Sequence, residues 1–590
     1  MILSVFCRSH DAAAGLTSWE RFRSQILVLL AAFACTICIG GGLVSAQEYS
    51  DSQPSEILSP QQVADNVDRL LLASLSNQQR QQLPPAAPAS VWLRRVSYDL
   101  VGQAPSPQAA RQFAASSDRG ASAGDEQRSR VITKLAADSR LVDNWSSFFR
   151  DVITYHASNT QAPGLGGVLL QGHVRDAIRE NRGWDDIARD LITASGKIKE
   201  NPAAGLAFLQ SGKPENMAAE VSRLFLGVKI ECAQCHDHPF NDYRREQFHQ
   251  LAAYFPRVAL RPIPNERDFL ISVNDRRFTP RSRNNNRFVG SPEHYMSDLE
   301  DPEAKGTLMQ PAFFVTGDET SFGTLDSDRR NDLADAICGS DNPYFSASMV
   351  NRIWTELLGV GFYETPDGLG LDQHPRAAAA LHYLADEFVQ HDYDLRWLVE
   401  TVVRTNAYSR RTVSQTDSAT AHPALPRVRR LRSDQLFASL TGLLDRQMLQ
   451  RLASSVRRRA GGQGMQMGGA SGTQYQDIVK VRFSDTFGYD PCLPQLEIQT
   501  TLGQQLAMLN GQQTNQSTTM RFGFVQQLQR SAQNSDQLID GIYWKLLSRA
   551  PNGKERLVAR RFIASSKDRY EAASDLAWAV LCGTEFQYRL

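Results

Sequence analysis

The sequence contains few cysteines for its length. Eight occur in 590 residues, and three of these lie within the first 38 positions. Small disulfide-stapled folds use cysteine far more densely, so a disulfide framework is excluded. Five cysteines follow that N-terminal stretch. Two of them are close together in sequence, and the other three are isolated and are expected to be buried. The five are Cys232, Cys235, Cys338, Cys492 and Cys582.

An excess of either charge is also absent. Lys plus Arg and Asp plus Glu each number 64, so the formal net charge is zero. Nucleic-acid-binding proteins and proteins that bind acidic membrane surfaces usually carry a basic excess. We therefore expect no nucleic-acid partner, and charge identifies no other partner.

Long apolar runs are missing after residue 46. Before that point, Arg21 and Arg23 precede an apolar run over Ile26–Ile39, and a small-x-small triplet follows at Val44–Ala46. This order is typical of a secretory signal that is cleaved after its last small residue. An uncleaved anchor is the alternative, but the short apolar core and the glycines at 40–42 disfavour it. We expect an exported protein, periplasmic or secreted, with no membrane span after cleavage.

Several common catalytic motifs are absent as well. The chain has no Gly-x-Ser-x-Gly, phosphate-binding loop or His-Glu-x-x-His. It does contain one Cys-x-x-Cys-His, formed by Cys232, Cys235 and His236. This composition would produce roughly 0.002 such matches by chance. The pattern is the one to which haem is covalently attached in c-type cytochromes.

The first interpretation of this motif is c-type haem and electron transfer. Cys232 and Cys235 would form the thioethers, and His236 would be the proximal iron ligand. The predicted export agrees with it, because haem of this type is attached outside the cytoplasm. The candidates for a sixth ligand are His173, His249, Met217 and Met309.

Other interpretations remain open. A non-haem zinc or iron site could use Cys232, Cys235, His236 and His238, with Asp237 or His249 as a further ligand. Alternatively, the chain is a non-catalytic exported scaffold, without a cofactor, in which Cys232 and Cys235 form a structural disulfide. An extracellular metal-dependent hydrolase is suggested only by size and compartment. The sequence does not decide whether the chain is an enzyme, nor which redox or protein partner it meets.

Helical periodicity dominates the rest of the chain. It predicts a mainly α, multi-helical protein of two domains with a small β/loop insert between them. Ser59-Pro60 and Asn342-Pro343 are typical helix starts, and alternating apolar residues at Phe269–Val273 and Met309–Val315 predict strands of the insert. The predicted boundaries are a signal peptide at 1–46, a linker at 47–60, an N-terminal helical domain at 61–256, the insert at 257–327, and a C-terminal helical domain at 328–590 with a mobile Gly-rich loop at 457–474.

Polar residues on the C-terminal helices have mostly structural interpretations. Arg352 follows Asn351 on one predicted helix, and we expect it to pair with Asp386 or Glu387 rather than to bind an anion. Trp397 fits the core face of a later helix.

A set of ordered motifs carries a family resemblance. Leu224–Phe240, followed by Leu251–Phe255, closely resembles the signature of domain of unknown function 1549, described as a Planctomycete cytochrome-like domain. Further motifs resemble its downstream partner, domain of unknown function 1553. They are Asn342–Phe345, Val350–Trp354, Leu357–Gly361, His374-Pro375, Leu384–Phe388, Tyr393–Leu398, Asn406–Ser409, Leu506–Asn510 and Leu576–Leu581.

The resemblance implies an exported protein of unsettled biochemical role. Its cytochrome label rests on the Cys-x-x-Cys-His pattern and on separate cytochrome domains in some relatives. This chain has one such motif, so it lacks an appended cytochrome domain. It also has Thr365-Pro366-Asp367-Gly368 where the family usually has a Pro-Val-Asp-Asp-like turn. Any second site at that turn is therefore in doubt.

Overall fold

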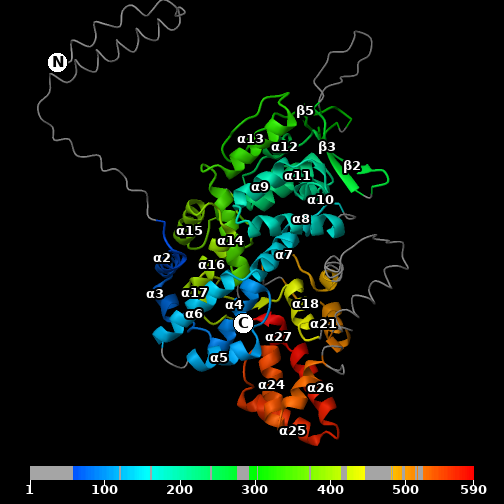
Figure 1. Cartoon of the computed structure of the whole chain (residues 1–590). Coiled ribbons are helices and arrows are strands. Elements are labelled where there is room, and N and C mark those ends of the chain that lie inside the picture. The colour runs from blue at the N-terminus through cyan, green and yellow to red at the C-terminus, as the bar shows by residue number, and fades with distance from the viewer. Residues whose placement is uncertain are drawn as a thin grey trace, which may run out of the picture. The chain divides into compact units, whose positions relative to one another are not determined.

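The chain is mainly α-helical, as predicted, and its described residues include three small antiparallel sheets (Figure 1). The predicted signal peptide, most of the predicted linker and the Gly-rich loop lie outside the described residues. Residues Ile57–Leu590 form one compact unit, and the predicted domain boundaries within it stay a prediction. The computed structural model describes residues 57–117, 121–159, 163–238, 242–266, 268–275, 292–301, 303–370, 374–413, 421–444, 480, 483–494, 498–511, 514–515, 518 and 523–590.

A succession of helices precedes the Cys-x-x-Cys-His motif. Ser59 caps the first described one, because its side chain accepts from the backbone N–H of Gln62, and Pro60 occupies the first turn as predicted. Two consecutive helices over residues 163–193 are separated by Asn181 in a left-handed conformation. The elements are α2 (Pro60–Ala73), α3 (Asn77–Gln81), α4 (Ala89–Val101), α5 (Pro107–Ser117), α6 (Ala121–Ala136), α7 (Arg140–Thr154), α8 (Pro163–Arg179), α9 (Trp184–Thr193), η3 (Pro202–Ala204) and α10 (Gly205–Leu209).

Three short helical pieces lead into and through the motif. Helix α11 (Pro214–Val221) continues into a π-helical turn, η4 (Ser222–Leu226), which ends at Gly227 with φ of 66°. The motif begins on a 3₁₀ turn, η5 (Ile230–Gln234), and α12 (Arg245–Ala252) follows it. The motif therefore lies on a short connection between α11 and α12.

The insert contains a small sheet with strand order β1-β3-β2. The pairing joins β2 (Val258–Ile263) to β3 (Asp268–Val273), and β1 (Gly196–Lys197) comes from the preceding helical region. The predicted strand at Phe269–Val273 is confirmed. The one expected over Met309–Val315 is wrong: a two-residue strand, β5 (Thr307–Leu308), ends just before it and pairs with β4 (Tyr295–Met296). The apolar residues there are buried by side-chain packing instead, with Phe313 in the core.

The C-terminal part is again helical. The predicted start at Asn342-Pro343 is confirmed, since Asn342 caps α14, and that helix ends at Gly359 with φ of 74°. Its elements are α13 (Asp326–Cys338), α14 (Pro343–Leu358), α15 (Ala378–Gln390), α16 (Leu395–Arg404), α17 (Asn406–Ser409), β6 (Arg429–Arg430), α18 (Ser433–Thr441), α21 (Leu502–Asn510), α23 (Phe524–Ser531), α24 (Ser535–Leu547), α25 (Gly553–Ser565), α26 (Arg569–Cys582), α27 (Thr584–Gln587) and β7 (Tyr588–Arg589). None of the described helices is both long and apolar enough to cross a bilayer.

Two hydrophobic cores hold these helices together. The larger one combines residues of both predicted domains, for example Trp184 and Phe225 from the first with Trp354 from the second. The smaller one is formed by the last helices together with α18 and Tyr98 of α4. The Cys-x-x-Cys-His motif is attached to the larger core through Ile230 and Ala233.

A buried ionic network joins the beginning and the end of the described chain. Asp99 on α4 accepts from Arg429 at 2.8 Å and from Arg589 at 2.6 Å. Arg589 also donates to Glu356 at 3.0 Å, and Arg432 donates to the same oxygen at 3.0 Å. All five side chains are at most 3% exposed.

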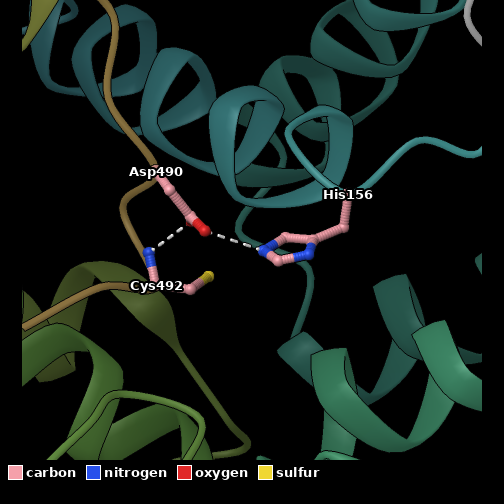
Figure 2. A group of neighbouring side chains, drawn as sticks. All are labelled: His156, Asp490 and Cys492. Carbon is pink, nitrogen blue, oxygen red and sulfur yellow. Dashed lines mark hydrogen bonds and ion pairs between the residues drawn. The ribbon is translucent and has the colours of Figure 1, made fainter. Parts of the chain in front are cut away.

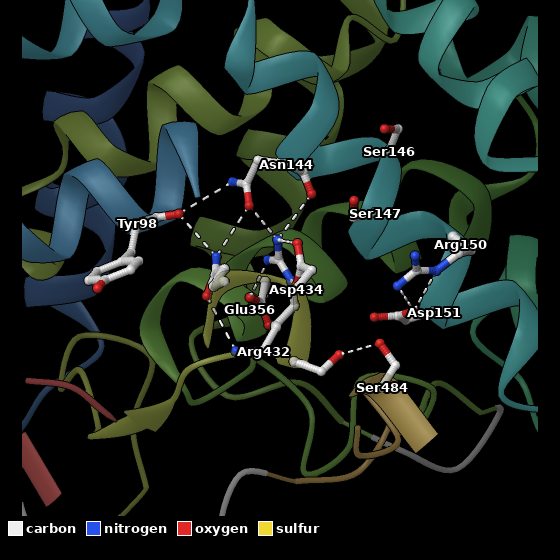
Figure 3. Close-up of polar contacts among 12 residues, drawn as sticks. Tyr98, Asn144, Ser146, Ser147, Arg150, Asp151, Glu356, Arg432, Asp434 and Ser484 are labelled. Carbon is white, nitrogen blue, oxygen red and sulfur yellow. Dashed lines mark hydrogen bonds and ion pairs between the residues drawn. The ribbon is translucent and has the colours of Figure 1, made fainter. Parts of the chain in front are cut away.

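Figure 3 shows the continuation of this network around Arg432. The Arg432 guanidinium bonds Asp434 at 3.1 Å and also reaches the side chain of Asn144 on α7. The Asn144 amide in turn donates to the Asp99 carbonyl at 2.8 Å. Each charge is matched by an opposite one, which is the condition for stable burial of ions.

Candidate functional site

The two cysteines of the Cys-x-x-Cys-His motif lie at the surface because of the three-residue repeat of the 3₁₀ turn on which the motif begins. In a 3₁₀ helix residues three apart share a face. Ile230 and Ala233 therefore point together into the core, where both are fully buried. Cys232 and Cys235 share another face, and both are exposed. The chain thus fixes the backbone of the motif while leaving its two sulfurs accessible.

Both sulfurs are free thiols in this structure. Of the three isolated cysteines, Cys492 is buried as expected, whereas Cys338 and Cys582 are half-buried. Burial raises the pKa of Cys338 to about 12 and that of Cys582 to about 11, so neither is a reactive thiol at neutral pH. The accessible thiols of the described chain are the pair in the motif.

His236 is held in one tautomer by its neighbour. Its Nδ1 lies 2.7 Å from the carbonyl oxygen of Asp237. A carbonyl can only accept, so in the neutral ring Nδ1 carries the proton and Nε2 keeps its lone pair. This is the arrangement that metal-bound histidines usually have, with the second ring nitrogen donating to a carbonyl. His236 is exposed, so its Nε2 is available to a ligand.

His238 lies close to the same site. Its backbone N–H donates to the Tyr243 carbonyl at 2.8 Å, and its ring meets the Tyr243 ring edge-on at 6.2 Å. Burial lowers the pKa of His238, and the charge of His236 lowers it further, whereas a hydrogen bond from the ring to the Lys229 backbone raises it. His238 is thus neutral at pH 7, which is the form that binds metals.

The first residue of helix α12 forms hydrogen bonds with the motif and with the residue that follows it. The backbone N–H of Arg245 donates to Asp237 Oδ1 at 2.8 Å, so this carboxylate sits at the positive end of the helix. The Arg245 side chain donates to the Gln234 carbonyl at 3.3 Å and to the Ser297 carbonyl at 2.7 Å. Asp237 is therefore a positioning residue, which explains one polar residue of the motif without a metal.

The side chains of two histidines and a glutamate contact one another in series, and the first of them bonds the backbone of the motif. His249 Nε2 lies 3.1 Å from the Gln234 carbonyl, so it donates and leaves Nδ1 to accept from His294 Nε2 at 2.9 Å. The remaining His294 nitrogen is 3.9 Å from Glu215. Burial lowers the pKa of His294 to about 4, and repulsion from His249 acts in the same direction against Glu215. The sequence did not reveal His294 or Glu215, because their spacing from the motif has no local signature.

The candidates for a sixth or additional ligand are mostly engaged elsewhere. Both ring nitrogens of His249 have partners, so binding a metal through it would break a hydrogen bond. His173 pairs with Asp190 at 3.2 Å. Met217 and Met309 are buried, at 1% and 3% exposure. A sixth ligand from this set stays a prediction.

The altered turn at Thr365–Gly368 supports the segment that leads into the motif. Asp367 is fully buried and accepts from Arg352 at 2.6 Å and from Arg223 at 2.9 Å. Burial alone would raise the pKa of Asp367, but the two guanidinium groups hold it far below its usual range. The expected pairing of Arg352 with Asp386 or Glu387 is wrong, because the turn brings Asp367 to it instead.

Arg352 also bonds the backbone just before the motif. Its guanidinium donates to the Leu224 carbonyl at 2.8 Å and to the Arg223 carbonyl at 3.1 Å. The turn adds a backbone bond from Leu369 to the Gly227 carbonyl at 2.9 Å. The second predicted domain therefore fixes the π-helical turn that positions the motif in the first. Trp397 is buried as expected, and the carboxylate of Asp394 caps its helix.

Two families match the chain in succession. A protein of unknown function (DUF1549) matches residues 66–259, which include the motif and α12. A protein of unknown function (DUF1553) matches residues 329–563, which include Arg352 and Asp367. Curated proteins and solved structures contain no match to this chain.

Proposed function

Because the chain belongs to the family in which a DUF1549 region is followed by a DUF1553 region, we propose a function centred on the motif that the first region contains. The chain is an exported redox protein whose site is Cys232, Cys235 and His236, and c-type haem is the cofactor that this donor set fits best. The observation that carries the proposal is the His236 tautomer, which leaves Nε2 unprotonated on an exposed residue, in a segment that also contains two exposed free thiols. Its N-terminal sequence supports export.

The residues present suit covalent haem. The two exposed thiols, Cys232 on η5 and Cys235 at its C-cap, can each form a thioether, and His236 Nε2 can ligate the iron. When bound, haem supplies one-electron transfer. The chain contributes a fixed backbone through the buried Ile230 and Ala233, and it sets the ring orientation through the Asp237 carbonyl.

A non-haem metal site on the same residues is the second candidate. His238 favours it, because this neutral imidazole lies close enough to His236 to feel its charge. Cys232, Cys235, His236 and His238 would be the four nitrogen and sulfur donors of a structural zinc site, although these four residues, which the structure describes, do not form a group of ligand atoms close enough to hold an ion. The scaffold alternative instead requires a Cys232–Cys235 disulfide, whereas both thiols are free here.

The test is an absorption spectrum and an intact mass of the full chain, produced together with c-type haem maturation machinery. We expect a Soret band and a haem-sized mass increment that survive denaturation and disappear in Cys232→Ala with Cys235→Ala. Cys338→Ala is the matched control, since it removes another free cysteine and should leave the haem in place.

A colourless, folded protein at the mass of the bare chain would overturn the haem proposal. Metal analysis of that protein then separates the two remaining possibilities. About one equivalent of zinc or iron that is lost in His236→Ala and His238→Ala supports the metal site. A mass lower by two hydrogens, with no metal bound, supports the disulfide scaffold.

A further inference from the structure

A second group of metal-binding side chains lies away from the Cys-x-x-Cys-His motif. His156 follows the C-terminal end of α7, and Asp490 and Cys492 lie on one turn far along the chain (Figure 2). One ring nitrogen, one carboxylate oxygen and the sulfur all lie within 4.8 Å of one another. The set thus combines three of the donor types that transition metals select.

The local backbone points the carboxylate of Asp490 at His156. Asp490 Oδ1 accepts from the Cys492 backbone N–H at 2.8 Å, which leaves Oδ2 facing His156 Nε2 at 3.1 Å. Two ligands at zinc bond lengths of about 2.0–2.1 Å and a tetrahedral angle would be about 3.3 Å apart. The observed spacing is close to that value before any ion is bound.

The ring nitrogen of His156 is buried and points into this group of side chains. Its Nε2 faces Asp490 Oδ2 at 3.1 Å, which is close enough for an ion pair. A metal ion between the three groups would replace this pairing with direct coordination.

The surrounding charges accommodate a cation. Arg223 donates to Cys492 Sγ at 2.9 Å, which at first sight opposes a metal. Arg223 is already matched, however, by Glu220 at 2.6 Å and Asp367 at 2.9 Å, and the latter also pairs with Arg352.

The charged side chains around Cys492 have a net negative charge. Three carboxylates, those of Glu220, Asp367 and Asp490, face two guanidinium groups, so one negative charge is in excess. A bound cation would offset this excess.

We propose that His156, Asp490 and Cys492 bind a divalent transition-metal ion, with zinc as the best match to nitrogen, oxygen and sulfur donors. Three protein ligands leave a fourth position, which is the pattern of zinc sites that hold a water or a substrate. This site is independent of the function proposed for the Cys-x-x-Cys-His motif.

Cobalt(II) titration of the reduced protein tests the proposal. The titration uses a Cys232→Ser, Cys235→Ser background, so that the first motif contributes no thiolate. We expect about one equivalent of cobalt with a thiolate-to-cobalt charge-transfer band, and displacement of that band by zinc. Adding Cys492→Ser should abolish the band, because no thiolate remains in the site.

Two further variants separate ligand loss from unfolding. His156→Gln and Asp490→Asn change partly exposed side chains, and each should weaken cobalt binding by more than the roughly 10–100-fold that loss of an outer-shell partner costs. Cys338→Ser is the matched control and should leave the band unchanged. Failure of the folded background protein to bind cobalt, or a band that persists in Cys492→Ser, would overturn the proposal.

Discussion

The guanidinium of Arg589 lies 2.6 Å from the carboxylate of Asp99, although 490 residues separate them in sequence. Neither side chain is exposed to solvent. Breaking a buried pair leaves an uncompensated charge and typically costs about 3–5 kcal/mol. Since Asp99 would keep Arg429, we expect Arg589→Ala to destabilise the protein by an amount at the lower end of that range.

Denaturant unfolding followed by circular dichroism measures this prediction. Arg556→Ala is the matched control, because Arg556 pairs with Asp540 in a half-exposed position on the C-terminal helices. It should cost less than about 1 kcal/mol. Equal shifts of the unfolding midpoint in the two variants would show that the buried network does not carry the stability assigned to it.

Acid should destabilise the protein through Asp434. Burial alone would raise its pKa, but Arg432 and Lys480 outweigh burial and lower the pKa of Asp434 to about 2. A depressed carboxyl pKa contributes stability above the unfolded value of 3.8, and this stability is lost as the pH falls toward 2. The loss amounts to about 2 kcal/mol.

The measurement is the unfolding midpoint between pH 5 and pH 2. Asp434→Asn removes the titrating group, so the variant should be less stable at pH 5 and should show a shallower acid dependence. Asp65→Asn, at an exposed position of α2, is the control that should leave the slope unchanged. An unchanged slope in Asp434→Asn would contradict the prediction.

The histidine pair under the motif should control its rigidity. His294 Nε2 donates to His249, which in turn bonds the Gln234 carbonyl inside the motif. His294→Ala leaves His249 Nδ1 without a donor, so we expect faster amide hydrogen exchange over residues 230–238. His294→Gln restores an N–H donor and should recover most of the protection. Equal exchange in all three proteins would mean that the pair does not support the motif.

The two cysteines of the motif should be the fast-reacting thiols of the described chain. Both are exposed, whereas burial raises the pKa values of Cys338 and Cys582 to about 12 and 11. We compare the unchanged sequence, without cofactor, with the double variant Cys232→Ser, Cys235→Ser at pH 8. About two more thiols per chain should react rapidly with a thiol reagent in the unchanged sequence than in the variant. Cys338→Ser should react like the unchanged chain. A difference below one equivalent would contradict the exposure of the pair.

Local features of this fold could be predicted from sequence, and features that depend on distant contacts could not. The caps at Ser59 and Asn342 and the helix end at Gly359 act within a few residues, so their side chains and conformations are visible in the sequence. The Phe269–Val273 strand was recognised by alternation, but the similar pattern at Met309–Val315 is buried without forming a strand. Alternation records burial on one side and does not by itself specify a strand partner.

The candidate site shows the same division. Cys232, Cys235 and His236 are adjacent, so the motif alone identified them. The partner of Arg352 was missed because Asp367 reaches it through a turn whose course the sequence does not specify. His156 and Cys492 are separated by more than 300 residues, and only the fold brings them together.

The bonds from Arg352 to the Leu224 carbonyl and from Leu369 to the Gly227 carbonyl have an evolutionary consequence. They make part of the DUF1553 region a structural element of the DUF1549 region. Recombination that separated the two would remove these bonds to the Leu224 and Gly227 carbonyls, and the Arg223 guanidinium would keep Glu220 but lose Asp367; each loss would reduce stability. Selection would therefore act against exchanging either region alone, so the two regions are expected to be inherited as one unit.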